Sequence, residues 1–416
     1  MKAPFDVDGS EPKGYRLGTH RAVDPEATWA RVRPHLPMLG ITRIADVTRL
    51  DHIGIPVALA IRPNAWSLSV AQGKGSRWEE ARVSAAMESI ETWHAERIER
   101  PSVVASYAEL LERGPVLGPT RLSLLPNTTW HHHLPLRWTQ GWDLMQREPV
   151  WVPWELLDLD CRVTATRPAP CFHVSSNGLA SGNTLLEASL HGLLEVVERD
   201  SSALWLCRQL LGNAAATKVD PGTIDDPGAR QTLERLDAAG FETAIFDETS
   251  SLGIPAFGCS IYEREPLSWA NPLPSNAGSG CHLDRGVALL RALHEAAQSR
   301  LTCIAGSRDD MPWRDYRDVQ GPARASDAPL PEVYRLPVAR DYRDVPAFAS
   351  DDLAQDLRTV LAALRTEGID RVVVVSLERP SVGIAVVRVV VPDLEYLGDG
   401  GEARRIGRRA RALLGR

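Results

Sequence analysis

The stretch Gly182-Asn-Thr-Leu-Leu-Glu187-Ala-Ser-Leu-His191-Gly-Leu-Leu-Glu195-Val-Val-Glu198-Arg199 combines an apolar helical pattern with a row of ionisable side chains. Glu187, His191, Glu195 and Glu198 recur at offsets of four and three, which puts them on one helix face. A solvated acidic face is the alternative, but such faces usually mix Lys with Glu, and this row contains neither Lys nor Arg. The row therefore indicates half-buried carboxylates, which need partners because burying them alone is costly.

Two other helix-like segments carry ionisable rows at the same spacing. These rows are Ser84, Glu88 and Glu91 in the first segment, and Arg291, Glu295 and Gln298 in the second. A surface salt bridge is the alternative for the pair at i and i+4 in the second row. Several carboxylates that converge in one fold usually hold divalent cations, and Mg2+ suits oxygen ligands. Together the three rows favour a metal-rich nucleotide enzyme.

Glycines precede each ionisable row, as Gly73-Lys-Gly75, Gly182-Asn183 and Gly278-Ser-Gly280. A Gly-Lys-Gly turn before a helix can bring backbone N–H groups and the Lys74 ammonium to phosphate oxygens. Taken alone it is equally typical of a plain turn, and it is not a Walker A motif. Arg199 is a second candidate for a phosphate contact, with an ordinary ion pair to a carboxylate as the alternative.

A unit of helix, glycine, strand, turn and strand occurs three times. Its glycine pairs are Gly40 and Gly54, Gly240 and Gly253, and Gly368 and Gly383. Amphipathic helices are expected before the first glycine of each pair, over 25–39, 227–239 and 351–367, because glycine is the usual helix C-cap. Pro34 and Pro37 should end the first helix early. We expect an α+β fold with strand pairs in one or two sheets, and a long loop over 263–281.

Composition narrows the function classes. The chain has 416 residues, of which 44% are hydrophobic, a net charge of -7 and a pI near 5.9, which disfavours a nucleic-acid binder. No apolar run reaches membrane-spanning length, and the N-terminus resembles no signal peptide. Six scattered cysteines without C-x-x-C spacing are typical of free thiols, so we expect a cytoplasmic protein.

The three rows, read with their flanking residues, resemble the three ATP-binding signatures of the YcaO family. The first signature is matched from Gln72 through Ser84 to Glu91, the second from Ser176 to Asp200, and the third from Arg291 to Arg300. The resemblance implies a single YcaO-like domain over 1–416. It also implies an ATP-binding core at about 66–305, and a C-terminal strand pair with a basic tail over 368–416.

The resemblance also implies cofactors and roles. YcaO proteins use ATP and Mg2+ to activate a peptide backbone amide, which becomes an azoline, a thioamide or an amidine. Carried over by position, the Mg2+ ligands would be Glu88, Glu91, Glu187, Glu195 and Glu198. Nucleotide contacts or ordering of these ligands would come from Lys74, Ser84, Asn183, Arg199, Arg291 and Glu295. His191 is as easily a packed or orienting residue as a catalytic one, and no general base is assigned.

Departures from the family pattern bear on the reaction. Thr92 stands where the first signature often has Arg, and the C-terminus lacks the Pro-x-Pro-x-Pro ending of many azoline-forming members. We expect no fused leader-binding domain, since the YcaO-like region begins near Gly18. These features favour thioamide formation with a separate TfuA-like partner, in a homodimer. The alternatives are an azoline-forming cyclodehydratase with a leader-binding partner, and a non-catalytic nucleotide-binding scaffold.

Overall fold

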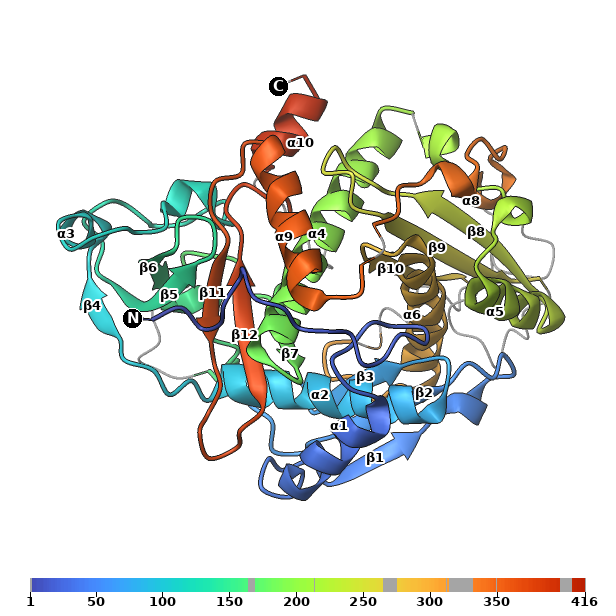
Figure 1. Cartoon of the computed structure of the whole chain (residues 1–416), viewed down its shortest axis with the longest axis horizontal. Helices are drawn as coiled ribbons and strands as arrows, with labels where there is room; N and C mark the ends of the chain where they lie inside the picture. Colours follow the sequence, from blue (N-terminus) through green and yellow to red (C-terminus); the bar gives the residue numbers. More distant parts are fainter. Residues whose placement is uncertain are drawn as a thin grey trace.

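In a computed structural model of the chain, described over residues 2–163, 169–212, 214–264, 275–311, 313, 332–348, 350–396 and 406–415, one arrangement of helices and strands recurs three times (Figure 1). Each copy has a helix, three antiparallel strands and a second, longer helix. Unit 1 consists of α1 Pro25–Val32, β1 Arg43–Asp46, β2 Val57–Ile61, β3 Val70–Lys74 and α2 Trp78–Glu96. Unit 2 consists of α5 Pro227–Ala238, β8 Phe241–Asp247, β9 Ala256–Glu263, β10 Ser275–Cys281 and α6 Arg285–Ala305.

Unit 3 is assembled from two distant parts of the chain. Its first helix and first two strands are C-terminal, whereas its third strand and long helix come from the middle of the sequence. The elements are α9 Leu353–Thr366, β11 Val373–Ser376, β12 Ala385–Val390, β7 Leu179–Gly182 and α4 Leu185–Leu210. The antiparallel pairing of β12 with β7 closes this unit, so the core cannot be completed before the C-terminal strands are made.

The glycines of the repeat have equivalent backbone conformations. The glycines after the first helices, Gly40, Gly240 and Gly368, have φ values of 75°, 79° and 73°. The turns between the first two strands contain Gly54, Gly253 and Gly383 at 75°, 69° and 65°. Glycine adopts this left-handed conformation without the steric cost that other residues meet, which explains why the same residue marks each unit.

Strand register confirms that the units are equivalent. The residue three positions after the turn glycine, Val57, Ala256 or Val386, pairs with Lys74, Cys281 or Ser181 of the third strand. These pairings align the ionisable rows, because each long helix follows its third strand at nearly the same distance. The equivalent triplets are Ser84, His191 and Arg291, then Glu88, Glu195 and Glu295, then Glu91, Glu198 and Gln298.

The long helices close into a ring. Helix α2 packs on β3 of its own unit and on β7 of unit 3, α4 packs on β7 and β10, and α6 packs on β10 and β3. Glycines permit the close approach of strand and helix: a Cβ on Gly73 would lie 2.0 Å from Ala85 N, and one on Gly280 would lie 2.6 Å from Ala292 N. In unit 3 a Cβ on Gly182 would lie 2.6 Å from Ala188 N, and Gly192 of α4 faces Ala180.

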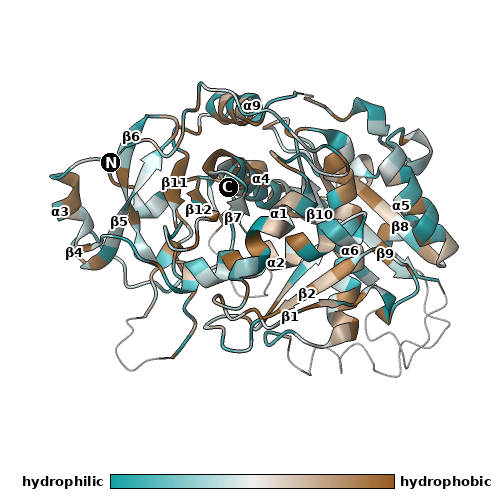
Figure 2. Cartoon of the chain, turned by 60° about the horizontal axis from the view of Figure 1, so that its bottom comes forward, coloured by the Kyte–Doolittle hydropathy of each residue, from teal (hydrophilic) through white to brown (hydrophobic). Residues whose placement is uncertain are grey.

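Other elements extend this ring at one side. Strand β12 belongs to a six-stranded sheet of order β4-β5-β11-β12-β7, in which β6 also pairs with β5. The added strands are β4 Val103–Ala105, β5 Leu136–Asp143 and β6 Glu148–Pro153, and the remaining short helices are α3 Tyr107–Leu111, α8 Glu332–Arg335 and α10 Arg408–Leu413. Apolar residues predominate in β2 and β8, as their brown colouring shows (Figure 2). The largest core cluster joins α4, α9 and β12.

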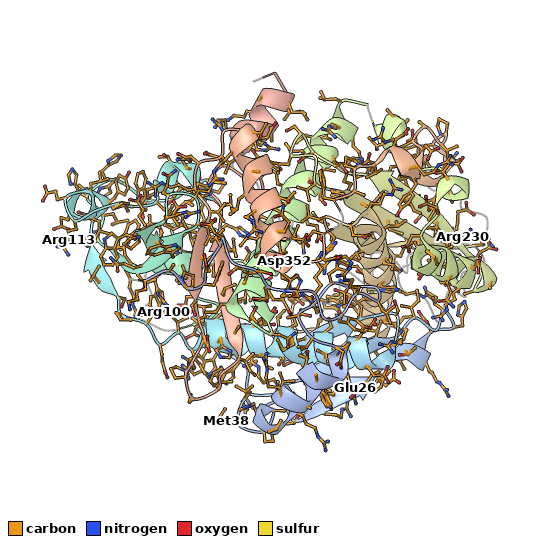
Figure 3. All side chains as sticks on the ribbon, viewed as in Figure 1. Glu26, Met38, Arg100, Arg113, Arg230 and Asp352 are labelled. Atoms are coloured by element: carbon orange, nitrogen blue, oxygen red, sulfur yellow. The ribbon has the colours of Figure 1, made fainter. Side chains whose placement is uncertain are left out.

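The N-terminal segment crosses the front of β11 and β12 before it turns back to α1 (Figure 1). Asp352, labelled in Figure 3, caps α9 and accepts hydrogen bonds from Ser10 Oγ at 2.6 Å and Glu11 N at 2.7 Å. Further along, the Tyr15 hydroxyl donates to Glu80 Oε1 on α2 at 2.6 Å. The segment is thus fastened to units 1 and 3.

The α+β class and the three predicted repeat helices are confirmed, and α1 ends before Pro34 as expected. The predicted loop over 263–281 is wrong at its end, since β10 pairs with β9 over seven residues. Its Gly-rich sequence has little strand propensity, but glycine is needed there for contact with α6. Among the described residues, none of the helices has the length and apolar character needed to cross a membrane.

Candidate functional site

The three predicted rows lie on α2, α4 and α6, the helices that form the ring. Five of their carboxylates influence one another electrostatically. The charge of Glu295 acts on Glu88, those of Glu88 and Glu195 act on Glu91, and that of Glu198 acts on Glu195. The structure therefore brings together acidic side chains that are more than 200 positions apart in the sequence.

Backbone N–H groups of the third strands orient these carboxylates in two ways. Glu88 accepts from Gln72 N of its own unit at 3.2 Å. Glu91 instead accepts from Ser181 N of unit 3 at 2.8 Å and from the Ser181 hydroxyl at 2.6 Å.

Equivalent contacts recur in the next two units. Glu198 accepts from Cys281 N of unit 2 at 2.9 Å, as Glu91 does from Ser181, and Ser279 N lies 3.5 Å from Glu295 Oε1. Glu295 also accepts from the Lys74 ammonium of unit 1. The acidic residues therefore lie where the units meet.

Burial makes the ionised form of several of these groups unfavourable. Burial raises the pKa of Glu91 to about 8, with the charges of Glu88 and Glu195 adding to the effect. It raises the pKa of Glu195 to about 7 and that of Glu88 above its usual value. Glu295 differs: burial pushes its pKa upward, but the Lys74 ammonium holds it below the usual value. Carboxylates in this state are stabilised by cations.

Glu187 is held by hydrogen bonds of a different kind from those of the other five carboxylates. Its Oε2 accepts from Ala22 N at 2.8 Å, and the Asn183 side-chain amide donates to both of its oxygens at 3.1 and 3.2 Å. The Thr28 hydroxyl in turn donates to Asn183 Oδ1 at 3.0 Å. Asn183 thus fixes Glu187, and the N-terminal segment helps to hold both.

Cationic and polar residues border the acidic centre. Arg291 lies 3.8 Å from Glu198, and its buried Nε has no hydrogen-bond partner among the described residues. Arg199 is half-buried and faces Glu195. Ser84 is half-buried on α2, at the position that His191 and Arg291 hold on the other two helices. The predicted site residues therefore all lie on the ring helices, except Lys74 at the end of β3 and Asn183 just after β7.

His191 is kept neutral by its surroundings. Burial, together with the charges of Arg21 and Arg291, lowers its pKa well below the usual value. Its Nδ1 is buried without a hydrogen-bond partner in the described part of the chain. Arg21, His191, Arg291 and Glu187 line a pocket with a volume of about 20 Å3, which is enough for a water molecule.

Three charged residues near this centre were missed by the sequence-based prediction. Arg21 lies 3.9 Å from Glu187, and Arg388 of β12 faces Glu195 and Glu91. Glu248 follows β8 and accepts a hydrogen bond from the Ser202 hydroxyl at 2.6 Å; burial raises its pKa to about 7. Alignment of the repeats on their turn glycines would have found one of the three, because Arg388 then aligns with Leu59 and Gly258. Glu248 is equivalent to Val47 and Leu377 by strand register, which only the structure shows.

A second polar cluster adjoins the pocket, which its two histidines also line. His20, His282 and Asp356 place their ligand atoms within 4.8 Å of one another. The Lys13 ammonium already lies among them, 2.6 Å from Asp356 Oδ2 and 3.0 Å from His20 Nδ1. A cation of the chain's own therefore neutralises this cluster, which fastens the N-terminal segment to α9.

The site has the donor set of a protein that binds a polyphosphate together with divalent cations. Three of its carboxylates, Glu88, Glu91 and Glu195, are half-buried with raised pKa values, which suits oxygen-loving Mg2+. Guanidinium N–H groups of Arg291 and Arg388 that have no partner among the described residues can donate to anionic oxygens. The fold and the site together thus define a Mg2+-dependent nucleotide-binding protein.

Residues 72–395 match the model of one protein family, described as YcaO cyclodehydratase, ATP- and Mg2+-binding. The chain belongs to the YcaO family, whose members are ATP-dependent peptide-modifying enzymes, and its cofactors are ATP and Mg2+. The resemblance and the fold expected from the three motifs are thus confirmed.

Relatives in other organisms match most of the chain. An uncharacterised protein of the tfuA 3′ region of Rhizobium leguminosarum bv. trifolii is 38% identical over 94% of this chain and 92% of its own length. An uncharacterised protein of Methanothermobacter thermautotrophicus is 34% identical over 95% of this chain and 99% of its own length.

Solved structures share the fold. YcaO from Methanopyrus kandleri, bound with AMPPCP and Mg2+, superposes with a TM-score of 0.68 at 23% identity, over 92% of this chain and 94% of its own. A heterocyclase in complex with substrate and cofactor gives a TM-score of 0.74 at 24% identity over 96% of this chain. The chain spans 56% of the length of that heterocyclase.

Proposed function

We propose that this enzyme activates a peptide or protein backbone amide for conversion to a thioamide, together with a TfuA-like partner protein. One observation carries the proposal: the relative from the tfuA 3′ region matches this chain along nearly the whole length of both proteins. Proteins encoded side by side commonly act together, so a TfuA-like protein is the expected partner.

The proposed reaction replaces the amide oxygen by sulfur. Hydrosulfide adds to the amide carbon, and the displaced electron pair stays on the oxygen. ATP bound with Mg2+ supplies a phosphoryl group for that oxygen, which makes it a good leaving group. Phosphate then leaves with the C–O bonding electrons, and the carbon is left doubly bonded to sulfur. Amide, hydrogen sulfide and ATP thus become thioamide, ADP and phosphate.

The acidic centre is proposed to hold Mg2+ through Glu88, Glu91, Glu195 and Glu198. Glu187 is the fifth proposed ligand, on the side that the N-terminal segment covers. Divalent ions held this way neutralise the phosphates and the charge that develops during phosphoryl transfer. The strand N–H groups at Ser181 and Cys281 would keep the carboxylates in place before the metal arrives.

The bordering residues are proposed to bind the nucleotide or to order the metal ligands. Lys74 from β3 and Arg291 from α6 bring positive charge toward the phosphates, and Glu295 fixes Lys74. Arg199 and Ser84 face the same centre, while Asn183 holds Glu187. Because these residues come from all three units, we propose that the chain works as one YcaO-like domain. The family resemblance also favours a homodimer, which light scattering of the purified protein would test.

Azoline formation is the second candidate, favoured by the description of the matching family as cyclodehydratase. In that reaction a Cys, Ser or Thr side chain of the peptide adds to the neighbouring amide carbon. A separate leader-binding protein would deliver the peptide. The phosphorylated oxygen leaves in the same way, so the acidic centre would have the same task.

Mass spectrometry of whole cells separates these functions even while the substrate peptide is unidentified. We expect cells with the native gene to contain a peptide in which one oxygen is replaced by one sulfur. Cells in which Glu195→Gln replaces the native protein should contain the unmodified form. Loss of one water in the native strain would instead support azoline formation. Identical peptides in both strains would contradict both functions.

A further inference from the structure

Arg388 occupies a position that the other two units do not use for a charged residue. It pairs with Leu179 of β7, just as Leu59 pairs with Gln72 of β3 and Gly258 pairs with Ser279 of β10. Leu59 is 4% exposed and belongs to an apolar cluster. The fold therefore accepts an aliphatic side chain, or none, at this position, and a buried guanidinium is not needed to form the unit.

The guanidinium of Arg388 is buried and only partly hydrogen-bonded. The residue is 2% exposed, and its Nη1 donates to Asn177 O at 2.8 Å. Its Nε and Nη2 are buried and have no hydrogen-bond partner in the described part of the chain. An unpartnered buried charge is strongly destabilising, so these N–H groups require a function that outweighs this cost.

Nearby carboxylates do not serve as hydrogen-bond partners for Nε and Nη2 of Arg388. Arg388 interacts electrostatically with Glu195 of α4 and Glu91 of α2, but among the described residues neither carboxylate accepts a hydrogen bond from its Nε or Nη2. Burial lowers the pKa of Arg388 to about 10, so the side chain stays charged at neutral pH. A positive charge stands beside the proposed metal ligands without being bound to them.

An anion that enters together with the metal ions would satisfy these free donors. Mg2+ cannot bind a guanidinium, and bound Mg2+ would take the carboxylate oxygens that face Arg388. The nucleotide brings phosphate oxygens, and the planar N–H fork of arginine suits phosphate geometry. Lys74 pairs with Glu295 of α6 and Arg291 lies beside Glu198 of α4, whereas Arg388 interacts with Glu91 of α2 and Glu195 of α4. The polyphosphate would thus meet cationic groups from two sides.

We propose that Nε and Nη2 of Arg388 bind oxygens of the terminal phosphoryl group of the nucleotide. This assignment rests on the proposed ATP site at Glu91 and Glu195. It adds a residue of the C-terminal strand β12 to a site otherwise built on the three long helices. Arg388 would then distinguish a nucleoside triphosphate from a diphosphate, since only the triphosphate reaches it.

Calorimetry with Mg2+ and two nucleotides tests the assignment. The variants are Arg388→Leu, which copies Leu59 of unit 1, and Arg388→Lys, which keeps the charge without the fork. Arg230→Leu, at the surface of α5 (Figure 3), is the matched control. We expect Arg388→Leu to bind a non-hydrolysable ATP analogue about tenfold more weakly or worse, and to bind ADP as the native enzyme does. Arg388→Lys should recover part of the loss.

Three other outcomes would have distinct meanings. Native affinity of Arg388→Leu for both nucleotides, or an equal loss for both, would overturn the assignment. A native enzyme that binds neither nucleotide would instead contradict the proposed ATP site itself. Melting temperatures confirm that each variant is folded, and Arg388→Leu should melt no lower than the native protein because it removes a buried unpartnered charge. A much lower melting temperature would show a structural role and overturn the assignment as well.

Discussion

Glu91 of α2 accepts hydrogen bonds from the backbone N–H and the hydroxyl of Ser181, a residue of a different repeat unit. The same relationship joins Glu198 of α4 to Cys281 N. Glu91 and Glu198 are thus each oriented by a strand that belongs to the next unit around the ring. The positions of the carboxylates therefore depend on how the three units close, so the site exists only in the complete fold.

Removal of one central carboxylate should stop the reaction without unfolding the protein. Glu195→Gln keeps the shape of the side chain but removes its charge, and we expect ATP turnover to fall by about 100-fold or more because a metal ligand is lost. The control is Glu234→Gln on the exposed face of α5. The measurement is the release of ADP and phosphate by each variant, and equal melting temperatures show that the variants are folded. Native turnover in Glu195→Gln would rule out this role for the residue.

The stability of the metal-free protein should fall between pH 6.5 and 8. Glu91 and Glu195 have pKa values of about 8 and 7 when folded, against 4.5 when unfolded. The folded protein therefore binds more protons in this range, and its free energy of unfolding decreases as pH rises. Below pH 6.5 buried histidines such as His94, with a lowered pKa of about 4, act in the opposite direction.

Thermal melting at several pH values measures this dependence. We expect the slope between pH 6.5 and 8 to flatten when Mg2+ and a non-hydrolysable ATP analogue are added, because metal ions stabilise the ionised carboxylates. Glu91→Gln should also flatten the slope in the metal-free protein. A melting temperature that rises with pH over this interval, without metal, would disprove the explanation.

We expect Glu248 to lower the stability of the fold and to support ATP turnover. Its equivalents in the other units are Val47 and Leu377, both buried, so the fold accepts an aliphatic residue at this position. A Cβ on Gly258 would lie 2.1 Å from Glu248 Oε1, which shows how tightly the carboxylate is enclosed. We expect Glu248→Leu to raise the melting temperature at pH 8 and to lower turnover, because the carboxylate faces Glu198 and Arg199. Lower stability with full activity would contradict this prediction.

The close contact between strands and long helices should be sensitive to one added methyl group. In Gly73→Ala the new Cβ would lie 2.0 Å from Ala85 N and 2.2 Å from Ala81 O, so α2 and β3 must separate. We expect a loss of about 1–3 kcal/mol or more in the free energy of unfolding. Gly118→Ala is the control, because its Cβ would have no neighbour closer than 3.9 Å. Chemical denaturation measures both, and equal stability of the two variants would refute the packing argument.

Much of this architecture could be predicted from local sequence patterns. The turn glycines and amphipathic helices mark the repeats, and the ionisable rows mark the inner helix faces. Strand β10 could not be predicted this way, because its sequence Ser-Asn-Ala-Gly-Ser-Gly-Cys has low strand propensity, and its pairing with β9 and its packing on α6 decide its conformation. The assembly of unit 3 from distant segments was also beyond local patterns.

Local sequence patterns likewise predict only some residues of the candidate site. Periodic spacing predicts the site residues on the long helices. Arg21 lies in a coil and Arg388 in an apolar strand, so no such spacing marks them. Arg388 interrupts a run of valines, a signal that becomes informative only when Leu59 and Gly258 are aligned with it. Tertiary closure, rather than any local preference, brings these side chains to the acidic centre.

The central claim is that carboxylates of different repeat units meet around metal ions that bind the nucleotide phosphates. A crystal structure with Mn2+ and a non-hydrolysable ATP analogue, using anomalous scattering to locate the metal, tests it most directly. We predict metal peaks within coordination distance of Glu91, Glu195 and Glu198, bridging to phosphate oxygens. Nucleotide and metal bound elsewhere, with Glu91 still hydrogen-bonded to Ser181 and no metal beside it, would contradict the claim.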